Sequence, residues 1–306
     1  MGGDERTWRP RRILVGYDGS EGGRDAVALA ATLAEPDAEF LLVNVIPPVG
    51  IFTTHPHRLE DEEPPQSQGF FDEALEGLPG RPVETRTYVA NSAARVLSEI
   101  AEEEGFDLIA IGPCYPGIVG RILIGSVGQG LMHGAVAPVA AAPRGYADQP
   151  PHRIRQIVAA YDGSPEAREA VAVAEVFARR EAARLRLLTV DVRNTTLPGV
   201  VGWEPLIPKS PEEIVAAGAA AVAAGIEVEG RVISGGSIAP AIVADSGDAD
   251  LLVVGSRGYG AVGRVLVGSV ATGLLHRAGF PVLTVPRPVS SEVGSEQSTR
   301  QAARAG

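Results

Sequence analysis

The six residues VGYDGS at positions 15–20 decide the architecture, because they return as AAYDGS at positions 159–164, an offset of 144 residues. Further along, VGRILIGSV at 119–127 returns as VGRVLVGSV at 262–270, an offset of 143 residues. A near-constant offset over this distance indicates a duplicated domain. Each copy is far too long to be one unit of a solenoid.

Each copy alternates short apolar runs with amphipathic stretches, which is typical of parallel βα units. In the second copy IVAAY at 157–161 predicts a buried strand, and SPE at 164–166 predicts the start of a helix that ends near Arg180. Further strands are expected at 185–192, 226–233, 251–254 and 281–285, with helices at about 211–224, from about 238 and from about 269. The sequence therefore predicts an α/β protein with two tandem doubly wound, Rossmann-like domains. Each domain is expected to hold a five-stranded parallel sheet with helices on both faces, and a ligand site at the carboxyl ends of the strands.

Composition shifts suggest where these domains begin and end. We predict a first domain at 1–147 and a second at 148–288, with DQPP at 148–151 as part of the linker. The tail at 289–306 is rich in Ser, Glu, Gln and Ala without a core pattern, which predicts disorder. In the first copy, residues 47–79 form a Pro-rich, acidic stretch that we interpret as a solvated loop in place of the second helix.

Charge and cysteine content exclude several classes of protein. The formal net charge is −11 and the isoelectric point is near 5.0, which argues against binding to nucleic acid or to an anionic membrane. Cys114 is the sole cysteine, so an internal disulfide is impossible. No signal peptide or membrane-spanning run is apparent. These features predict a cytoplasmic location.

A glycine pattern in the second copy indicates a phosphate site. Gly255 and Gly258 follow an apolar strand, and nine residues later Gly268 and Ser269 stand where a helix is expected to begin. Glycines let the backbone approach a ligand closely. Free N–H groups at a helix start, together with the helix dipole, suit phosphate oxygens.

The pattern G-x2-G-x9-G-S resembles the motif of ATP-binding universal stress proteins, and the resemblance covers both copies, at about 11–144 and 154–287. It implies that Asp162 lies near the ribose or phosphates with a divalent cation, Mg²⁺ or Mn²⁺, and that Val192 contacts adenine through its backbone. The candidate site of the second domain comprises Ala160, Asp162, Gly163, Val192, Gly255, Arg257, Gly258, Gly268, Ser269 and Val270. That of the first domain comprises Gly16, Asp18, Val45, Gly112, Gly125, Ser126 and Val127, with Asp18 as its candidate metal ligand.

The first copy departs from the motif. It reads Gly112-Pro113-Cys114-Tyr115, and nine residues later Gly125-Ser126. Pro113 lacks the N–H that Ser256 keeps, and Tyr115 replaces the second glycine. Losing one hydrogen bond to a charged group costs about 1.5–3 kcal/mol, or roughly ten- to a hundredfold in affinity. We therefore expect the better ATP site in the second half.

Simpler explanations exist for several of these residues. Asp18 and Asp162 also suit a turn before a helix. His133 and His276 occupy matching positions near a helix end, where a favourable interaction with the dipole explains them better than catalysis. Cys114 lies in the phosphate loop of the first copy, and only a lowered pKa would make it redox-sensitive.

The leading hypothesis is a stress-response protein that binds ATP or another adenine nucleotide and acts as a nucleotide-dependent regulatory module. The alternatives are a slow metal-dependent ATPase and an interaction protein that needs no nucleotide. The resemblance also suggests an intrachain pseudo-dimer, formed by pairing of the closing strands at 138–142 and 281–285, and two such chains can pair again as a homodimer.

Overall fold

The computed structural model describes residues 8–48, 57–58, 69–113, 125–149, 153–192, 210–256 and 269–286. The elements of the first half are β1 (Arg12–Gly16), α1 (Glu21–Leu33), β2 (Glu39–Ile46), β3 (His57–Arg58), α2 (Asp72–Glu76), β4 (Val83–Val89), α3 (Ala93–Glu104), β5 (Leu108–Ile111), α4 (Ser126–Gly134) and β6 (Val139–Ala141). Those of the second half are β7 (Gln156–Ala160), α5 (Pro165–Glu181), β8 (Arg184–Asp191), α6 (Pro211–Ala221), β9 (Val228–Ser234), α7 (Ile238–Asp245), β10 (Leu251–Gly255), α8 (Ser269–Leu275) and β11 (Val282–Val285). The predicted tail at 289–306 lies outside the described residues.

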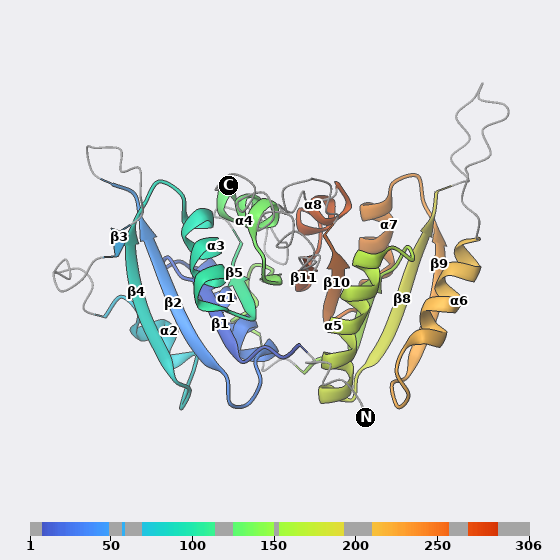
Figure 1. Ribbon diagram of the computed structural model, residues 1–306, viewed down its shortest axis with the longest axis horizontal. Coiled ribbons are helices and arrows are strands. Elements are labelled where there is room, and N and C mark those ends of the chain that lie inside the picture. Colours follow the sequence, from blue (N-terminus) through green and yellow to red (C-terminus); the bar gives the residue numbers. More distant parts are fainter. Residues whose placement is uncertain are drawn as a thin grey trace, which may run out of the picture.

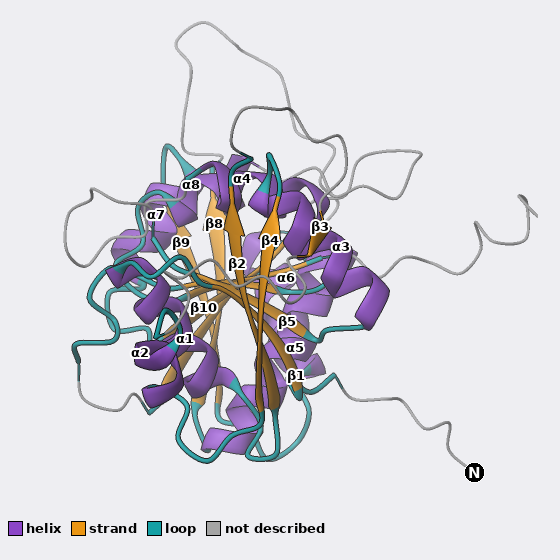
Figure 2. Cartoon of the chain, turned by 90° about the vertical axis from the view of Figure 1, so that its left-hand side faces the viewer, coloured by secondary structure: helices purple, strands orange, loops and turns teal. Residues whose placement is uncertain are grey.

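All strands in the described residues belong to one 11-stranded sheet, in the order β3-β4-β2-β1-β5-β6-β11-β10-β7-β8-β9. The first half contributes five parallel strands in the doubly wound order β4-β2-β1-β5-β6, and the second half contributes β9-β8-β7-β10-β11 in the same order. The short strand β3 adds an antiparallel edge to β4. Figure 1 shows the halves side by side, with β4 and β9 toward the outer edges. Figure 2 shows helices on both sides of the twisted sheet. The predicted tandem doubly wound fold is confirmed.

The two halves join through their closing strands. β6 pairs antiparallel with β11, with Val139 opposite Thr284 and Ala141 opposite Val282. The Thr284 hydroxyl donates a hydrogen bond to the Val139 carbonyl at 3.1 Å. The expected pairing of 138–142 with 281–285 is therefore confirmed, and it turns two sheets into one.

Helix starts follow the sequence signals. Ser164 is the N-cap of α5 and accepts a hydrogen bond from the Ala167 N–H, with Pro165 in the first turn. Ser20 does the same for α1 by accepting from the Gly23 N–H. The first helical turns of α1 and α5 are thereby fixed in the same way, directly after β1 and β7.

The region at 47–79 differs from the predicted loop, because it contains the strand β3 and the short helix α2. Phe70 and Phe71, next to α2, pack on Tyr17 with ring centroids 5.5 and 5.7 Å away. In the second half α6 occupies the corresponding place, and Gly218 lets it lie directly on the Tyr161 ring. Burial of a tyrosine at the end of each first strand explains why a helix is retained even in the Pro-rich stretch.

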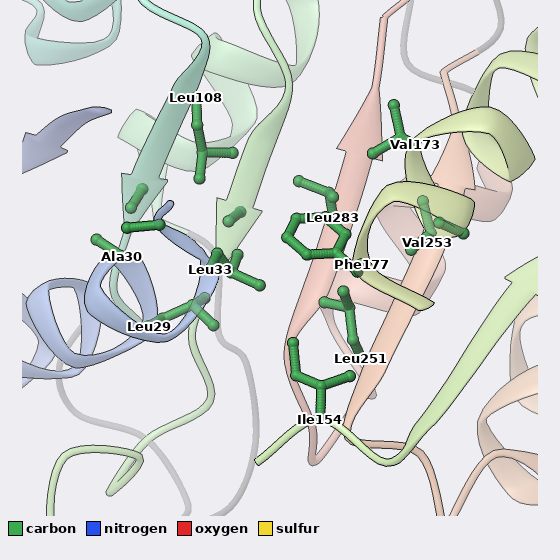
Figure 3. Close-up of a cluster of buried hydrophobic side chains, with 14 of the residues drawn as sticks. Leu29, Ala30, Leu33, Leu108, Ile154, Val173, Phe177, Leu251, Val253 and Leu283 are labelled. Atoms are coloured by element: carbon green, nitrogen blue, oxygen red, sulfur yellow. The ribbon is translucent and has the colours of Figure 1, made fainter. Parts of the chain in front are cut away.

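The core is continuous between the halves. Figure 3 shows Leu29, Ala30 and Leu33 of α1 in the same buried cluster as Val173 and Phe177 of α5. Burial of such apolar surface is the main stabilising contribution to a fold of this size. Within the described residues, no helix has both the length and the apolar character needed to cross a membrane.

Polar contacts also stabilise the junction: one set crosses between the halves, and the other holds the segment that leads from the first half to the second. From α5, the Arg180 guanidinium donates hydrogen bonds to the carbonyls of Thr32, Leu33 and Ala34 at the end of α1. From α1, the buried Asp25 carboxylate accepts from the N–H groups of Gly145 and Ala147 at 2.9 and 2.8 Å, which holds the interdomain segment on the helix. Burial raises the Asp25 pKa, and these two hydrogen bonds partly offset that increase.

Candidate functional site

Each half contains a cavity at the carboxyl ends of its central strands, where a doubly wound sheet binds ligands. The first cavity lies over the ends of β1, β2 and β5 and beside the starts of α1, α3 and α4, and has a volume of ≈ 390 Å³. The second lies over β7, β8 and β10 and beside α5, α7 and α8, and has a volume of ≈ 130 Å³. The cavities are therefore built from corresponding elements.

An aspartate turn stands at the mouth of each cavity. Asp18 Oδ1 accepts hydrogen bonds from the Ser20 N–H at 3.1 Å and from the Ser20 hydroxyl at 2.5 Å. Asp162 Oδ1 accepts from the Ser164 N–H at 3.0 Å. The turn explanation for both aspartates thus holds, and it leaves each carboxylate among the residues that line its cavity. Gly163, and Gly19 in the first half, adopt φ of 77° and 74°, which explains the glycine that follows each aspartate.

The start of α4 forms another wall of the first cavity. Gly125 is the N-cap of this helix, and Gly125, Ser126 and Val127 line the cavity. The first N–H groups of a helix have no partner within the helix, so they are available to an anion. In the second half α8 begins at Ser269, as predicted, and Val270 lines the cavity. Arg257, Gly258, Gly268 and the side chain of Ser269 lie outside the described residues.

Close packing of the backbone requires glycine at positions 112 and 255, apart from any contact with a ligand. A Cβ atom on Gly255 would lie 2.5 Å from the Glu166 carbonyl oxygen, and one on Gly112 would collide with the Gly22 carbonyl. The strands β5 and β10 therefore touch the first turns of α1 and α5 through bare backbone. Both glycines still line their cavities.

Val192 does not occupy the position expected for an adenine contact. It follows the last residue of β8, its side chain is 43% exposed, and it is not among the described residues that line the second cavity. Tyr17 donates its N–H to Val43 and Tyr161 donates its N–H to Leu188, both at 2.9 Å, so Val45 corresponds to Val190. Val45 and Val190 each line a cavity. The candidate for the adenine contact in the second half is thus Val190. Alignment of the two copies at Val45 would have identified it from the sequence.

The cavity walls differ in side-chain size at matched positions. Six pairs line both cavities with the larger residue in the second half: Gly16/Ala160, Gly22/Glu166, Gly23/Ala167, Val43/Leu188, Ala93/Ile238 and Gly128/Ala271. The pair Ile111/Val254 is reversed by one methylene. Of these six pairs, the sequence alone identified Gly16 and Ala160 as candidate site residues, and the glycine motif gave no signal for the other five.

Among the described residues, no group of three or more His, Cys, Asp or Glu side chains is placed to hold a metal ion by itself. A cation at Asp18 or Asp162 would need ligands from a bound molecule, such as phosphate oxygens. His276 directly follows α8, in keeping with the helix-end interpretation.

The sequence profile of the Universal stress protein family matches this chain twice, at residues 10–143 and 153–286. The chain belongs to the universal stress protein family. A universal stress protein of Mycolicibacterium smegmatis is 30% identical over 293 residues, which cover 89% of this chain and 96% of that protein. One from Mycobacterium tuberculosis is 28% identical over 205 residues, which cover 64% of this chain and 69% of that protein.

Solved structures support the same fold. The crystal structure of a universal stress protein from Archaeoglobus fulgidus matches with a TM-score of 0.63 at 20% identity, over 91% of this chain and 99% of that one. A putative universal stress protein from Pseudomonas aeruginosa matches with a TM-score of 0.59 at 17% identity, over 93% and 96% of the two chains. Tandem universal stress protein domains thus account for the whole sheet described above.

Proposed function

We propose that this tandem universal stress protein binds adenine nucleotides, ATP foremost, and that occupancy regulates its contacts with a protein partner. The observation that carries the proposal is the construction of both cavities. Each lies at the switch point of a doubly wound sheet, with an aspartate turn on one side and a helix start on the other. The intact G-x2-G-x9-G-S motif at 255–269 adds support for the second half.

Each part of a nucleotide has a matching wall. The helix starts at Ser126 and Ser269 suit the phosphates, because N–H donors and the helix dipole favour negative charge. Val45 and Val190 stand on the apolar side of each cavity, which suits the faces of a purine ring. The aspartate turns lie between these walls and suit the ribose.

A divalent cation fits this arrangement. A carboxylate near a triphosphate repels it, and Mg²⁺ or Mn²⁺ bound by phosphate oxygens removes that repulsion. Asp18 and Asp162 would then contact the cation in their respective sites. The metal supplies charge neutralisation in this proposal and holds the phosphates in place.

The same proposal includes a cytoplasmic location and pairing of two chains. The sole cysteine and the net charge of −11 support a reducing, soluble environment. Hydrolysis forms no part of the proposed role, since regulation by binding needs only a difference in affinity between two states.

The test is to denature freshly purified protein, identify the released nucleotide by chromatography and measure its stoichiometry per chain. The matched variants are Gly268→Glu for the second cavity and Gly125→Glu for the first. Each adds a negative side chain at the expected phosphate position, so each should remove the nucleotide of its own half. Gly112 and Gly255 are unsuitable for this purpose, because a side chain there disturbs helix packing with or without a ligand.

The outcomes separate the hypotheses. About one nucleotide per chain that disappears in Gly268→Glu supports a working second site, and about two supports both sites. Absence of bound nucleotide, followed by no binding on titration of ATP with Mg²⁺ or Mn²⁺, would favour a nucleotide-independent interaction protein. Steady phosphate release that Asp162→Ala abolishes would favour the ATPase instead.

A further inference from the structure

The two cavities have the same frame and different walls. α3 and α7 begin at Ala93 and Ile238 directly after the N-caps Ser92 and Ser237, so these two residues occupy the same helix position. Val43 and Leu188 accept the same backbone hydrogen bond from Tyr17 and Tyr161. The wall formed by the second strand and the third helix of each domain therefore carries Val43 and Ala93 in the first half, and Leu188 and Ile238 in the second.

In the proposed function this wall is the part of the cavity left for the base. The helix start at Gly125 suits the phosphates, and Asp18 suits the ribose. The base is then left with the apolar side, which Val43, Val45 and Ala93 help to form. Replacement of Ala by Ile adds three carbon atoms at this wall, and replacement of Val by Leu adds one.

Two of the other size differences, at Gly22 and Gly23, do not explain the larger volume of the first cavity equally well. At Gly22 the absent side chain leaves no free space, since a Cβ there would collide with the Pro113 carbonyl. At Gly23 a Cβ would lie 2.9 Å from the Tyr17 ring and 3.1 Å from the Asp18 carboxylate. Backbone and existing side chains thus fill these positions, while Val43 and Ala93 border the cavity itself.

We propose that the two sites select nucleotides by the size of the base. The first cavity accepts an adenine nucleotide that carries an added group on its base, and Leu188 and Ile238 exclude that ligand from the second cavity. This inference rests on the proposed function, since it assigns a different ligand to each proposed nucleotide site. Val43 and Ala93 are its specificity-determining residues.

The experiment measures the Kd of ADP, N6-benzyl-ADP and 8-benzylamino-ADP by calorimetry on the full chain. Gly268→Glu isolates the first site and Gly125→Glu isolates the second. The readout is the ratio of the Kd of each enlarged analogue to that of ADP. One methylene in an apolar pocket changes discrimination by roughly tenfold or more, so for at least one analogue the ratio should be at least about tenfold lower at the first site.

Exchange of the wall residues provides the decisive step. Ala93→Ile in the first-site protein should raise the ratio by about tenfold or more, and Ile238→Ala in the second-site protein should lower it by a similar factor. Both replacements are expected to be tolerated, because each introduces the residue that the other half has at the same position, the first residue of α3 or α7. Arg184→Lys, at the opposite end of β8, should leave both ratios unchanged, and circular dichroism checks the fold of every variant.

The results distinguish failure of the proposed nucleotide binding from failure of the proposed size selection. If neither single-site protein binds ADP or ATP with Mg²⁺ or Mn²⁺ present, the proposed function is overturned and this inference with it; if ATP alone binds, the ratios are measured with ATP and its benzyl analogues. If ADP binds while both analogues give equal ratios at the two sites, or while the exchanges leave the ratios unmoved, size selection alone is overturned.

Discussion

The two halves of the molecule share the turn that follows the first strand and differ in the volume of the cavity beside that turn. Ser20 and Ser164 cap corresponding helices with the same hydrogen bond, at 3.2 and 3.1 Å, and each serine N–H donates to the preceding aspartate, Asp18 or Asp162. The cavities that these turns border nevertheless measure ≈ 390 and ≈ 130 Å³. A duplicated domain can therefore keep its backbone frame, which many hydrogen bonds specify together, while single wall residues change the space for a ligand.

The junction between the halves is also asymmetric, because matched positions of the two copies hold different residues. The positions offset by 144 residues hold Leu33 and Phe177, Pro36 and Arg180, and Asp25 and Glu169. Strand pairing between β6 and β11 is shared equally, while the aromatic ring and the guanidinium come from the second half. The carboxylate that holds the interdomain segment comes from the first half. Exchanging or truncating these residues tests whether the halves contribute unequally to stability.

The largest effect is expected at the matched core positions Phe177 and Leu33, both fully buried. Phe177→Ala should lower the free energy of unfolding by about 4–5 kcal/mol and Leu33→Ala by about 3 kcal/mol. The larger value follows because the Phe177 ring also packs edge-on against Trp8 at 5.7 Å and beneath the Arg180 guanidinium at 5.1 Å. Urea unfolding followed by circular dichroism measures both. Equal losses would show that the junction is energetically symmetric.

A smaller loss is expected from Arg180, which stabilises the end of α1 from the other half. Its side chain is 18% exposed and donates hydrogen bonds to three carbonyls of α1 at 2.7–3.1 Å. Arg180→Met should cost about 2 kcal/mol, since it removes charge-assisted bonds from a helix C-terminus.

The neighbouring Arg179 is the matched control. It is 54% exposed and makes an i,i+4 pair with Glu175 at 3.4 Å. Arg179→Met should change the unfolding free energy by less than about 0.5 kcal/mol. Similar losses for both variants would mean that the cap across the junction contributes little.

Sequence reasoning reached the fold because duplication and strand–turn–helix signals are local. Ser164 and Pro165 mark the start of α5, and the closing strands at 138–142 and 281–285 pair as expected. The site was reached less completely. The resemblance placed the adenine contact at Val192, whereas the register of β8 on β7 and of β2 on β1 makes Val190 the counterpart of Val45. Residues such as Ala93 and Ile238 carry no motif, and only the packing of a third helix against the second strand brings them to the cavity.

Local sequence patterns also could not predict the contacts at the junction, because these join residues far apart in the chain. The hydrogen bonds of Asp25 provide the last test of how the halves differ. Its side chain is 2% exposed and each carboxylate oxygen accepts one backbone N–H. In Asp25→Asn the amide NH₂ would face one of those N–H donors, which should cost about 1–2 kcal/mol. Glu169→Gln, at the exposed matching position, should be neutral within about 0.5 kcal/mol.

The pH dependence makes this prediction specific to the carboxyl group. Burial raises the Asp25 pKa, so between the ordinary aspartate pKa of about 3.9 and the raised value the folded chain binds more protons than the unfolded chain. The contribution of Asp25 to stability is therefore greatest at the acid end and decreases as pH rises through the raised pKa. Asparagine does not titrate, so the difference between wild type and Asp25→Asn should be largest near pH 4 and shrink toward neutrality. Unfolding curves recorded across this range check the prediction. A difference that stays constant with pH would contradict it, and the two hydrogen bonds alone would then account for the cost of Asp25→Asn.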